Sequence, residues 1–287
     1  MVTKNSIFDR RRFLELGLRG GITLIIGSAI QTFAAEAEAK ERPVSHQVLF
    51  RYETIVGNTL EDDNYLEAIP EEYKRFPNHA EEDGLIRVVK PLKITMTMNV
   101  KEKDIENRIY RRVTGDFDFR RYTVRKDQGL SLLARTITDG YPTLEEKAQA
   151  LLCFVQTAIS YDQEKAALVE RSEDWFTADY IRRPKKTLLD QKGDCKDTSV
   201  LYASLLAQLA IPSVYLHYDR HFNIGVPLDF EHNRIRVAPA SLPLEANIEY
   251  QHRLYFVAET AAEQPLFIGK ILPKDRGRKP DNIQVAI

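Results

Sequence analysis

The stretch that decides the fold is GDCKDTSVLYASLLAQL, residues 193–209. From Val200 to Leu209, apolar side chains cover nearly the whole circumference of a helix. A helix that is apolar on all sides is a buried one. The stretch therefore predicts a buried helix from about Asp194 to Leu209, with Cys195 in its first turn.

The segments on either side of this helix predict an α+β domain. Upstream, Thr143 and Glu146 have the spacing of a capping box, and apolar residues at helical intervals follow, so we expect a helix over 143–159. Downstream, alternating apolar residues predict one strand over 213–217 that continues through 221–226, and a second strand over 253–258. An order of helix, buried helix and then strands is typical of the α+β class.

The first half of the chain is rich in short strand-like segments. Alternating or β-branched residues predict strands at 47–52, 85–89, 92–100 and 120–124. Residues 61–83 are acidic and contain two prolines, which predicts a loop with a helical turn. We expect residues 45–129 to form a small β-rich region without a chemical motif, and residues 271–287 to form a loose basic tail.

The N-terminus has the features of an export signal. Arg10 and Arg11 are followed by one spacer residue and Phe13-Leu14, which is the twin-arginine arrangement. The apolar run over 20–33 is too short for a membrane span, which needs about 20 residues, and small residues follow it. We expect residues 1–35 to be a signal for the twin-arginine export machinery, residues 36–44 to be a linker, and the protein to be periplasmic. A buried N-terminal helix, and an uncleaved signal that anchors the protein in the membrane, are the alternatives.

Composition excludes several classes of function. The chain has 287 residues, of which 43% are hydrophobic and 29% charged. Removing 1–35 would take five basic and two acidic residues from totals of 41 and 42, leaving a net charge of about −4. This balance provides no field for nucleic acid. We find no cofactor motif, and among the six histidines only His217 and His221 have a spacing that could suggest metal ligands, which is too little for zinc.

Cys195 is the candidate nucleophile. The first turn of a helix has four unpaired N–H groups and the positive end of the helix dipole. This position favours a thiolate, and it places the Cys195 amide where it could hold an oxyanion. Asp194 and Asp197 act against the thiolate, because their carboxylates lie beside it in the sequence. A base partner is therefore required.

Three further residues could complete such a site. His221 lies on the predicted strand after the helix and is the expected base, and His217, with the same parity, is its rival. Glu259, at the end of the next strand, could orient the imidazole, although it could also be a solvated acid. Gln156 could donate to an oxyanion, although it could also be an ordinary polar residue of its helix.

Several segments together resemble the transglutaminase-like superfamily, specifically its bacterial and archaeal cysteine domains. The resemblance covers residues 130–270 and rests on Phe154-Val155-Gln156, Tyr161-Asp162, Pro184, Thr187-Leu188, residues 192–199, His221–Val226, Glu259-Thr260 and Ile268-Gly269. It implies a papain-like core, in which a central helix carries the cysteine and a sheet carries the histidine and the acid. It also implies that Cys195, His221 and Glu259 form a catalytic triad, although the acid is Asp in better-known members.

The sequence thus favours an exported thiol-dependent amide hydrolase or acyltransferase that acts on a peptide or protein. A catalytically silent binding or assembly module of the cell envelope is the alternative, because some members of the superfamily have lost activity. Cys153 is surrounded by apolar residues and is expected to be an inert buried thiol. A Cys153–Cys195 disulfide, which would block the nucleophile, is the other possibility for an exported protein.

Overall fold

The protein is described from a computed structural model, in which the chain divides into two units, residues 1–44 and 45–287. The structure describes residues 43–60, 85–105, 108–109, 118–171, 180–227, 247–262, 266–270 and 277–286. The predicted export signal, most of the predicted linker and the predicted loop at 61–83 lie outside these residues.

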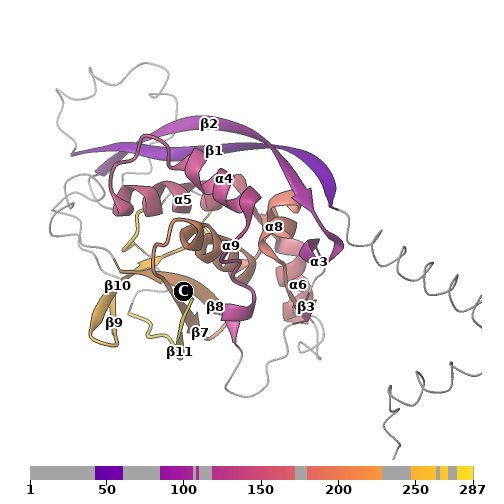
Figure 1. Ribbon diagram of the computed structural model, residues 1–287. Helices are drawn as coiled ribbons and strands as arrows, with labels where there is room; N and C mark the ends of the chain where they lie inside the picture. The colour runs from indigo at the N-terminus through magenta and orange to yellow at the C-terminus, as the bar shows by residue number, and fades with distance from the viewer. Residues whose placement is uncertain are drawn as a thin grey trace, which may run out of the picture. The chain divides into compact units, whose positions relative to one another are not determined.

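Helix α9 (Cys195–Gln208) is the central element of this unit (Figure 1). Its inner residues are fully buried, which confirms the prediction from residues 193–209: Val200, Leu201, Tyr202, Leu205 and Leu206 all have no exposed surface. Each buried leucine or valine contributes about 1.5–3 kcal/mol through the hydrophobic effect. Helix α9 packs against α4 (Gln128–Ile137) and α5 (Leu144–Ala158). The Tyr202 hydroxyl donates a hydrogen bond to the Ala148 carbonyl of α5 at 3.0 Å.

Helix α5 begins as its sequence predicts. The Thr143 hydroxyl accepts a hydrogen bond from the Glu146 N–H at 3.2 Å, and the Glu146 carboxylate accepts one from the Thr143 N–H at 3.0 Å. This is the capping box expected from the spacing of the two residues. Cys153 is fully buried in the same helix, and the Gln149 side-chain amide donates to its sulfur at 3.3 Å. Cys153 and Cys195 are not joined by a disulfide, so the disulfide alternative is wrong.

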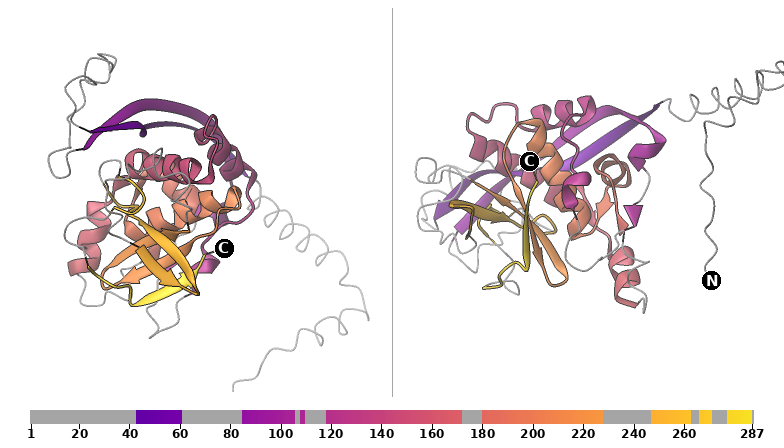
Figure 2. Two further views of the ribbon diagram at one scale, coloured as in Figure 1. Left: turned by 90° about the vertical axis from the view of Figure 1, so that its left-hand side faces the viewer. Right: turned by 60° about the horizontal axis from the view of Figure 1, so that its bottom comes forward.

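A five-stranded sheet covers one side of the helices, as two further views show (Figure 2). Its order is β11-β7-β8-β10-β9, and every neighbouring pair is antiparallel. The strands are β7 (Val214–Tyr218), β8 (His221–Val226), β9 (Asn247–Tyr250), β10 (Arg253–Ala258) and β11 (Asn282–Val285). Mixed helices and an antiparallel sheet make this an α+β fold.

The structure corrects three sequence-based expectations about strands. Residues 213–226 do not form one strand: β7 and β8 are joined by a tight turn in which Arg220 adopts a left-handed backbone, with φ 59°. Residues 282–285, expected in a loose tail, pair with β7 as an edge strand. The segment expected as a strand at 120–124 contains a 3₁₀ turn, η2 (Phe119–Arg121), because Asp118 caps it through the Arg120 N–H.

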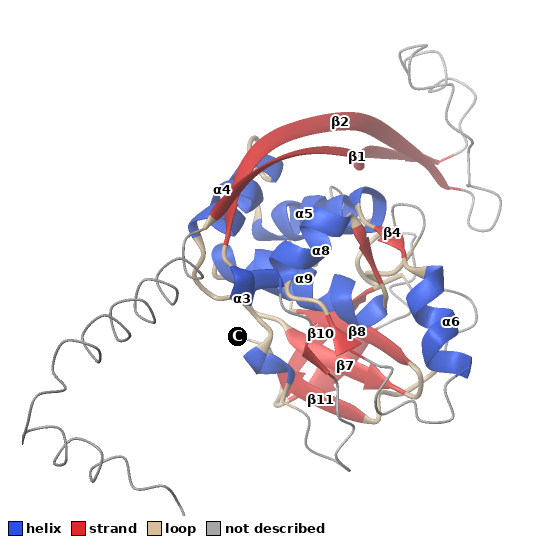
Figure 3. Cartoon of the chain, turned by 90° about the vertical axis from the view of Figure 1, so that its right-hand side faces the viewer, coloured by secondary structure: helices blue, strands red, loops and turns tan. Residues whose placement is uncertain are grey.

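Strands β1 (Val44–Leu60) and β2 (Leu85–Val100) form a two-stranded sheet that arches over the helices on the side away from the five-stranded sheet (Figures 1 and 3). Alternate residues from Val48 to Thr54 of β1 are buried, as a strand with one buried face requires. Phe50 and Tyr52 contact Phe154 of α5 edge-on, with ring centroids 5.4 and 5.3 Å apart. These strands therefore share a core with the helices, and the predicted domain boundaries stay a prediction.

The smaller elements position the start of α9. Strands β4 (Ser160–Tyr161) and β6 (Lys192–Gly193) pair in parallel, so α6 (Gln163–Arg171) and α9 begin side by side. Strand β5 (Tyr180–Ile181) pairs with β3 (Arg108–Ile109), and α3 (Glu102–Ile105) and α8 (Pro184–Asp190) complete the unit. In the part of the chain that the structure describes, none of the helices has the length and apolar character needed to cross a membrane.

Candidate functional site

Cys195 is the first residue of α9 and is nearly buried, with 8% of its surface exposed. The helix begins here because Asp194 caps it: its carboxylate accepts hydrogen bonds from the N–H groups of Lys196 and Asp197, each at 3.0 Å. The Asp197 carboxylate in turn accepts from the Asp194 N–H at 3.3 Å, which completes a capping box. The cap fixes the direction of the first turn and thus the position of the thiol.

The structure brings Cys195, His221 and Glu259 together. His221 is the first residue of β8, and Glu259 follows the last residue of β10, which is the neighbouring strand. The His221 Nε2 and Glu259 Oε2 atoms are 2.7 Å apart, and Cys195 lies close enough to His221 to influence the pKa of the imidazole. Glu259 is fully buried, and its second oxygen accepts a hydrogen bond from the Ala261 N–H at 3.1 Å.

These contacts favour the protonated imidazole. Burial acts to lower the pKa of His221, but the hydrogen bond to Cys195 and then the bond and charge of Glu259 raise that pKa from 6.5 to about 10. The Glu259 carboxylate and the Cys195 sulfur both stabilise positive charge on the imidazole ring. An imidazolium held against a sulfur can stabilise a thiolate and can later give its proton to a leaving group.

Side-chain hydroxyls tie the start of α9 to the two strands that carry His221 and Glu259. The Thr260 hydroxyl is 3.0 Å from the Thr198 hydroxyl and 2.9 Å from the Ser199 hydroxyl. The Ser199 hydroxyl also donates to the Phe222 carbonyl at 3.3 Å. All three hydroxyl residues are buried, so these bonds hold the helix and both strands in one register.

Gln156 of α5 holds the segment around Glu259 in place. Its side-chain nitrogen donates to the Glu259 carbonyl at 2.7 Å, and its side-chain oxygen accepts from the Leu266 N–H at 3.0 Å. Gln149, two turns earlier, makes the same kind of pair with the Leu266 carbonyl and the Ile268 N–H, at 3.0 and 2.9 Å. The oxyanion role predicted for Gln156 stays a prediction, because these contacts describe a structural clamp.

His217 is not the equivalent of His221, contrary to the shared parity expected from a single strand. In the β7–β8 hairpin, His217 lies opposite Phe222, whereas His221 lies opposite Tyr218. Directly opposed residues share a face of the sheet, and neighbours along a strand do not, so the two histidines point to opposite faces. The rings of His217 and Phe222 lie 5.3 Å apart. The turn at Arg220 is the physical reason, since it reverses the chain.

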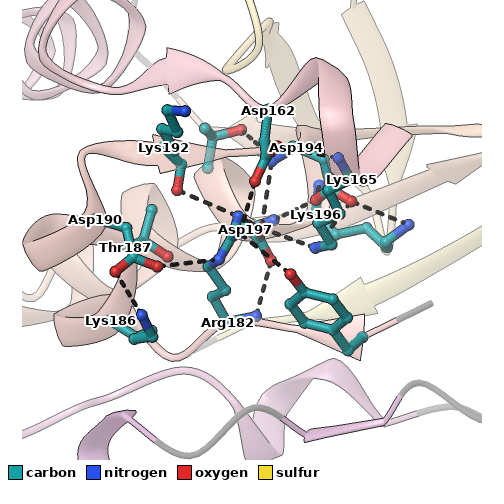
Figure 4. A network of polar contacts seen from close by, with 12 residues as sticks. Asp162, Lys165, Arg182, Lys186, Thr187, Asp190, Lys192, Asp194, Lys196 and Asp197 are labelled. Atoms are coloured by element: carbon teal, nitrogen blue, oxygen red, sulfur yellow. Dashed lines mark hydrogen bonds and ion pairs between the residues drawn. The ribbon is translucent and has the colours of Figure 1, made fainter. Parts of the chain in front are cut away.

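A buried network of charges surrounds the first turn of α9 (Figure 4). Lys165 of α6 reaches the carboxylates of Asp194 and Asp197, at 3.0 and 2.8 Å. The guanidinium of Arg182, which follows β5, reaches Asp162 at 2.6 Å, Asp197 at 3.2 Å and Asp190 at 3.3 Å. The Arg182 N–H also donates to Asp197 at 2.8 Å. The two acids expected to oppose a thiolate at Cys195 therefore have buried cationic partners.

A cavity of about 870 Å³ lies beside the candidate site. Residues next to the site in the sequence or in space, including Gly193, Thr198, Ala261 and Gln156, line part of it. The β1–β2 sheet lines another part through Tyr52 and Leu92 among others. Cys195, His221 and Glu259 are not among its lining residues. Across the described segments of the chain, His, Cys, Asp and Glu side chains form no group of three suited to a metal ion.

Comparison with known proteins found a match for part of this domain. Residues 128–226 match a family model described as a transglutaminase-like domain, a range that contains Gln156, Cys195 and His221. This stretch of the chain is therefore similar to a transglutaminase-like domain. Glu259 lies beyond the matched range.

The other two comparisons provide weaker evidence. A search among curated proteins found no match. A crystal structure described as that of a “putative protease” from Parabacteroides distasonis matches with 13% sequence identity and a TM-score of 0.30. The match covers 66% of this chain and 40% of that chain, so this protein spans about two fifths of the length of that protein.

Sequence reasoning missed several residues that the structure places around the site. Lys165 lies in a polar stretch without a helical pattern, and Arg182 follows a strand of only two residues, so neither has a local signal. Thr260 has no signal beyond its position next to Glu259. The available signal was the pair of acids at positions 194 and 197, because buried carboxylates require cationic partners.

Proposed function

We propose that the protein is a thiol-dependent amide hydrolase or acyltransferase in which Cys195 is the nucleophile, His221 the base and Glu259 the residue that orients His221. The observation that carries the proposal is that the His221 ring lies 2.7 Å from the buried Glu259 carboxylate and close enough to Cys195 for the thiol to affect its pKa. The transglutaminase-like domain supports the same class of chemistry.

In the proposed reaction, the Cys195 sulfur attacks the carbonyl carbon of an amide and forms a carbon–sulfur bond. The proton held by His221 passes to the departing nitrogen as the carbon–nitrogen bond breaks, which leaves a thioester on Cys195. Water or an amine, deprotonated by His221, then attacks the thioester and releases the thiol. The backbone N–H of Cys195, at the helix start, is the proposed donor to the oxyanion.

We also infer that the core is papain-like. A buried helix that starts with the cysteine and packs on an antiparallel sheet that carries the histidine supports this inference. The cavity beside the site, bordered by Gly193 and Ala261, is the proposed entrance for the acyl substrate, which we expect to be a peptide or protein.

An activated ester tests the acyl chemistry without knowledge of the natural substrate. We expect p-nitrophenyl acetate to release nitrophenolate and to leave an acetyl group on Cys195, identified by mass spectrometry of its peptide. Cys195→Ala should abolish the acylation, and His221→Ala should slow it by orders of magnitude. An unacylated wild-type protein would support the catalytically silent binding or assembly module instead.

Export through the twin-arginine machinery to the periplasm is a separate proposal, supported by Arg10-Arg11 and the apolar run after them. Replacing both arginines by lysine keeps the charge but removes the motif. We expect the variant to stay in the cytoplasm on cell fractionation, and unchanged localisation would overturn the proposal.

A further inference from the structure

Two carboxylates lie in the first turn of the helix that begins at Cys195, and elementary electrostatics says that they should suppress a thiolate there. Asp194 and Asp197 are both buried, with 4% and 0% of their surfaces exposed. Burial strengthens their repulsion of a negative sulfur, because the charges are poorly screened. A helix start with this sequence can hold a thiolate only if another group cancels the two charges.

We propose that Lys165 and Arg182 are positioning residues of the site, whose buried charges neutralise Asp194 and Asp197 and thereby let the first turn of α9 stabilise a Cys195 thiolate. The inference rests on the proposed function, because it assumes that Cys195 acts as a nucleophile. Neither residue contacts the thiol in the proposed reaction; both act through the two carboxylates.

The geometry supports this role for Lys165 first. Its side chain is 1% exposed, and its Nζ atom is 3.0 Å from Asp194 and 2.8 Å from Asp197. The ammonium also lies 4.4 Å from the centre of the Tyr180 ring. An isolated buried ammonium is costly, so Lys165 is stable there only because both carboxylates remain ionised around it.

Arg182 contacts the Asp197 carboxylate from a second direction. Its guanidinium and its backbone N–H both contact Asp197, at 3.2 and 2.8 Å. The same guanidinium reaches Asp162, which accepts a hydrogen bond from the Lys165 N–H at 3.0 Å and thus holds the start of α6. Arg182 therefore positions Lys165 as well as neutralising Asp197.

The residues that form ion pairs around the start of α9 are equal in positive and negative charge. Four cations and four anions form the network drawn in Figure 4: Lys165, Arg182, Lys186 and Lys196 with Asp162, Asp190, Asp194 and Asp197. From the sheet side, His221 lies near the thiol and is paired with Glu259. With the network neutral, the helix dipole and the imidazolium determine the charge state of the sulfur.

The two acids of the cap differ in their charge environment. Burial acts to raise the pKa of Asp194, but Lys196 and Lys165 lower it. For Asp197, burial and the adjacent Asp194 carboxylate raise the pKa, against the pull of Lys165. Asp194 is thus the acid whose negative charge is held most firmly, which makes it the better one to remove in an experiment.

The test is the pH midpoint of the rate at which iodoacetamide labels Cys195 in the full-length chain, followed by mass spectrometry of the Cys195 peptide. We expect Lys165→Met to raise the midpoint by about one pH unit, because it leaves the carboxylates underneutralised. Asp194→Asn should lower it, since asparagine keeps the capping oxygen but not the charge. The double variant should return close to the wild type, and Lys165→Arg should keep the wild-type midpoint.

A purely structural role for Lys165 predicts something different, namely slower labelling with no opposite shifts in the two single variants. If Lys165→Met does not fold, Asp194→Asn still decides: a midpoint that stays or rises overturns the inference. If wild-type Cys195 labels near neutral pH and loses this in His221→Ala, while the charge variants leave the midpoint unchanged, the proposed function stands and this inference fails. An unreactive wild-type Cys195 overturns both.

Discussion

Buried carboxylates flank Cys195 on two sides, with one on the side of the sheet and two on the side of the helix. The two sides differ in the charged groups that pair with these carboxylates. On the sheet side, Glu259 is paired with His221, whose charge can change as protons move. On the helix side, Asp194 and Asp197 are paired with Lys165 and Arg182, whose charges are permanent at physiological pH. The sheet side can therefore exchange a proton with the thiol, whereas the helix side can only set the field in which that exchange occurs.

The largest effect on the reaction rate should come from removing the histidine on the sheet side. We expect His221→Ala to lower the rate of acylation by p-nitrophenyl acetate by about 10²–10⁴-fold, since it removes the general base. His217→Ala is the matched control, because His217 lies on the opposite face of the same hairpin. Equal losses of rate in the two variants would contradict the assignment of the base.

Removing a buried cation on the helix side should cause a large loss of stability. Lys165→Met leaves two buried carboxylates short of a cation, which typically costs about 3–5 kcal/mol in the free energy of unfolding. Urea unfolding followed by circular dichroism measures this cost. Arg120→Met is the control, because Arg120 pairs with Asp118 on the surface and its loss should leave the unfolding midpoint nearly unchanged. A small effect for Lys165→Met would show that the network is weakly coupled to folding.

Gln156→Leu should have a smaller effect that separates a clamp from an oxyanion donor. The variant leaves the Glu259 carbonyl and the Leu266 N–H without their buried partner, at a cost of about 1–3 kcal/mol. Gln149→Leu removes the matching pair of bonds two turns earlier in α5 and serves as the comparison. If Gln156 is only a clamp, the two variants should lose stability and acylation rate in similar proportion. A loss of rate confined to Gln156→Leu would support the oxyanion role.

The stability of the protein should also depend on pH through the sheet side. The pKa of His221 is raised in the folded protein, to about 10 from 6.5, so protonation stabilises the fold. This contribution is complete below about pH 6.5 and is lost as the pH rises through about 10. Urea midpoints measured between these values should fall more steeply for the wild type than for His221→Ala. Parallel profiles would mean that His221 is not held as an imidazolium.

The sequence was sufficient to predict the elements whose signal is local. The apolar circumference of residues 200–209 identified α9, and the Thr143–Glu146 spacing identified the start of α5. Cys195 could be placed at a helix start because helix caps are local structures. The proximity of Glu259 to His221 was expected from strand order, and here the structure places them 2.7 Å apart.

The features that the sequence did not predict depend on contacts between segments that are far apart in the chain. The turn at Arg220 has no glycine or asparagine to mark it, so β7 and β8 looked like one strand. Strand β11 contains only four residues and is stabilised by pairing with β7, not by its own pattern. Lys165 and Arg182 lie 32 and 15 residues before Asp197, and nothing local shows that they are buried beside it.

The central claim is that His221 activates Cys195. Competition between the two cysteines for one reagent tests this claim most directly. Iodoacetamide at neutral pH, with mass spectrometry of both cysteine peptides, should label Cys195 rapidly and leave the fully buried Cys153 intact. The advantage of Cys195 should disappear in His221→Ala, which would show that the imidazole and not exposure alone makes it reactive. Slow labelling of Cys195 at the same rate in both proteins would contradict the account.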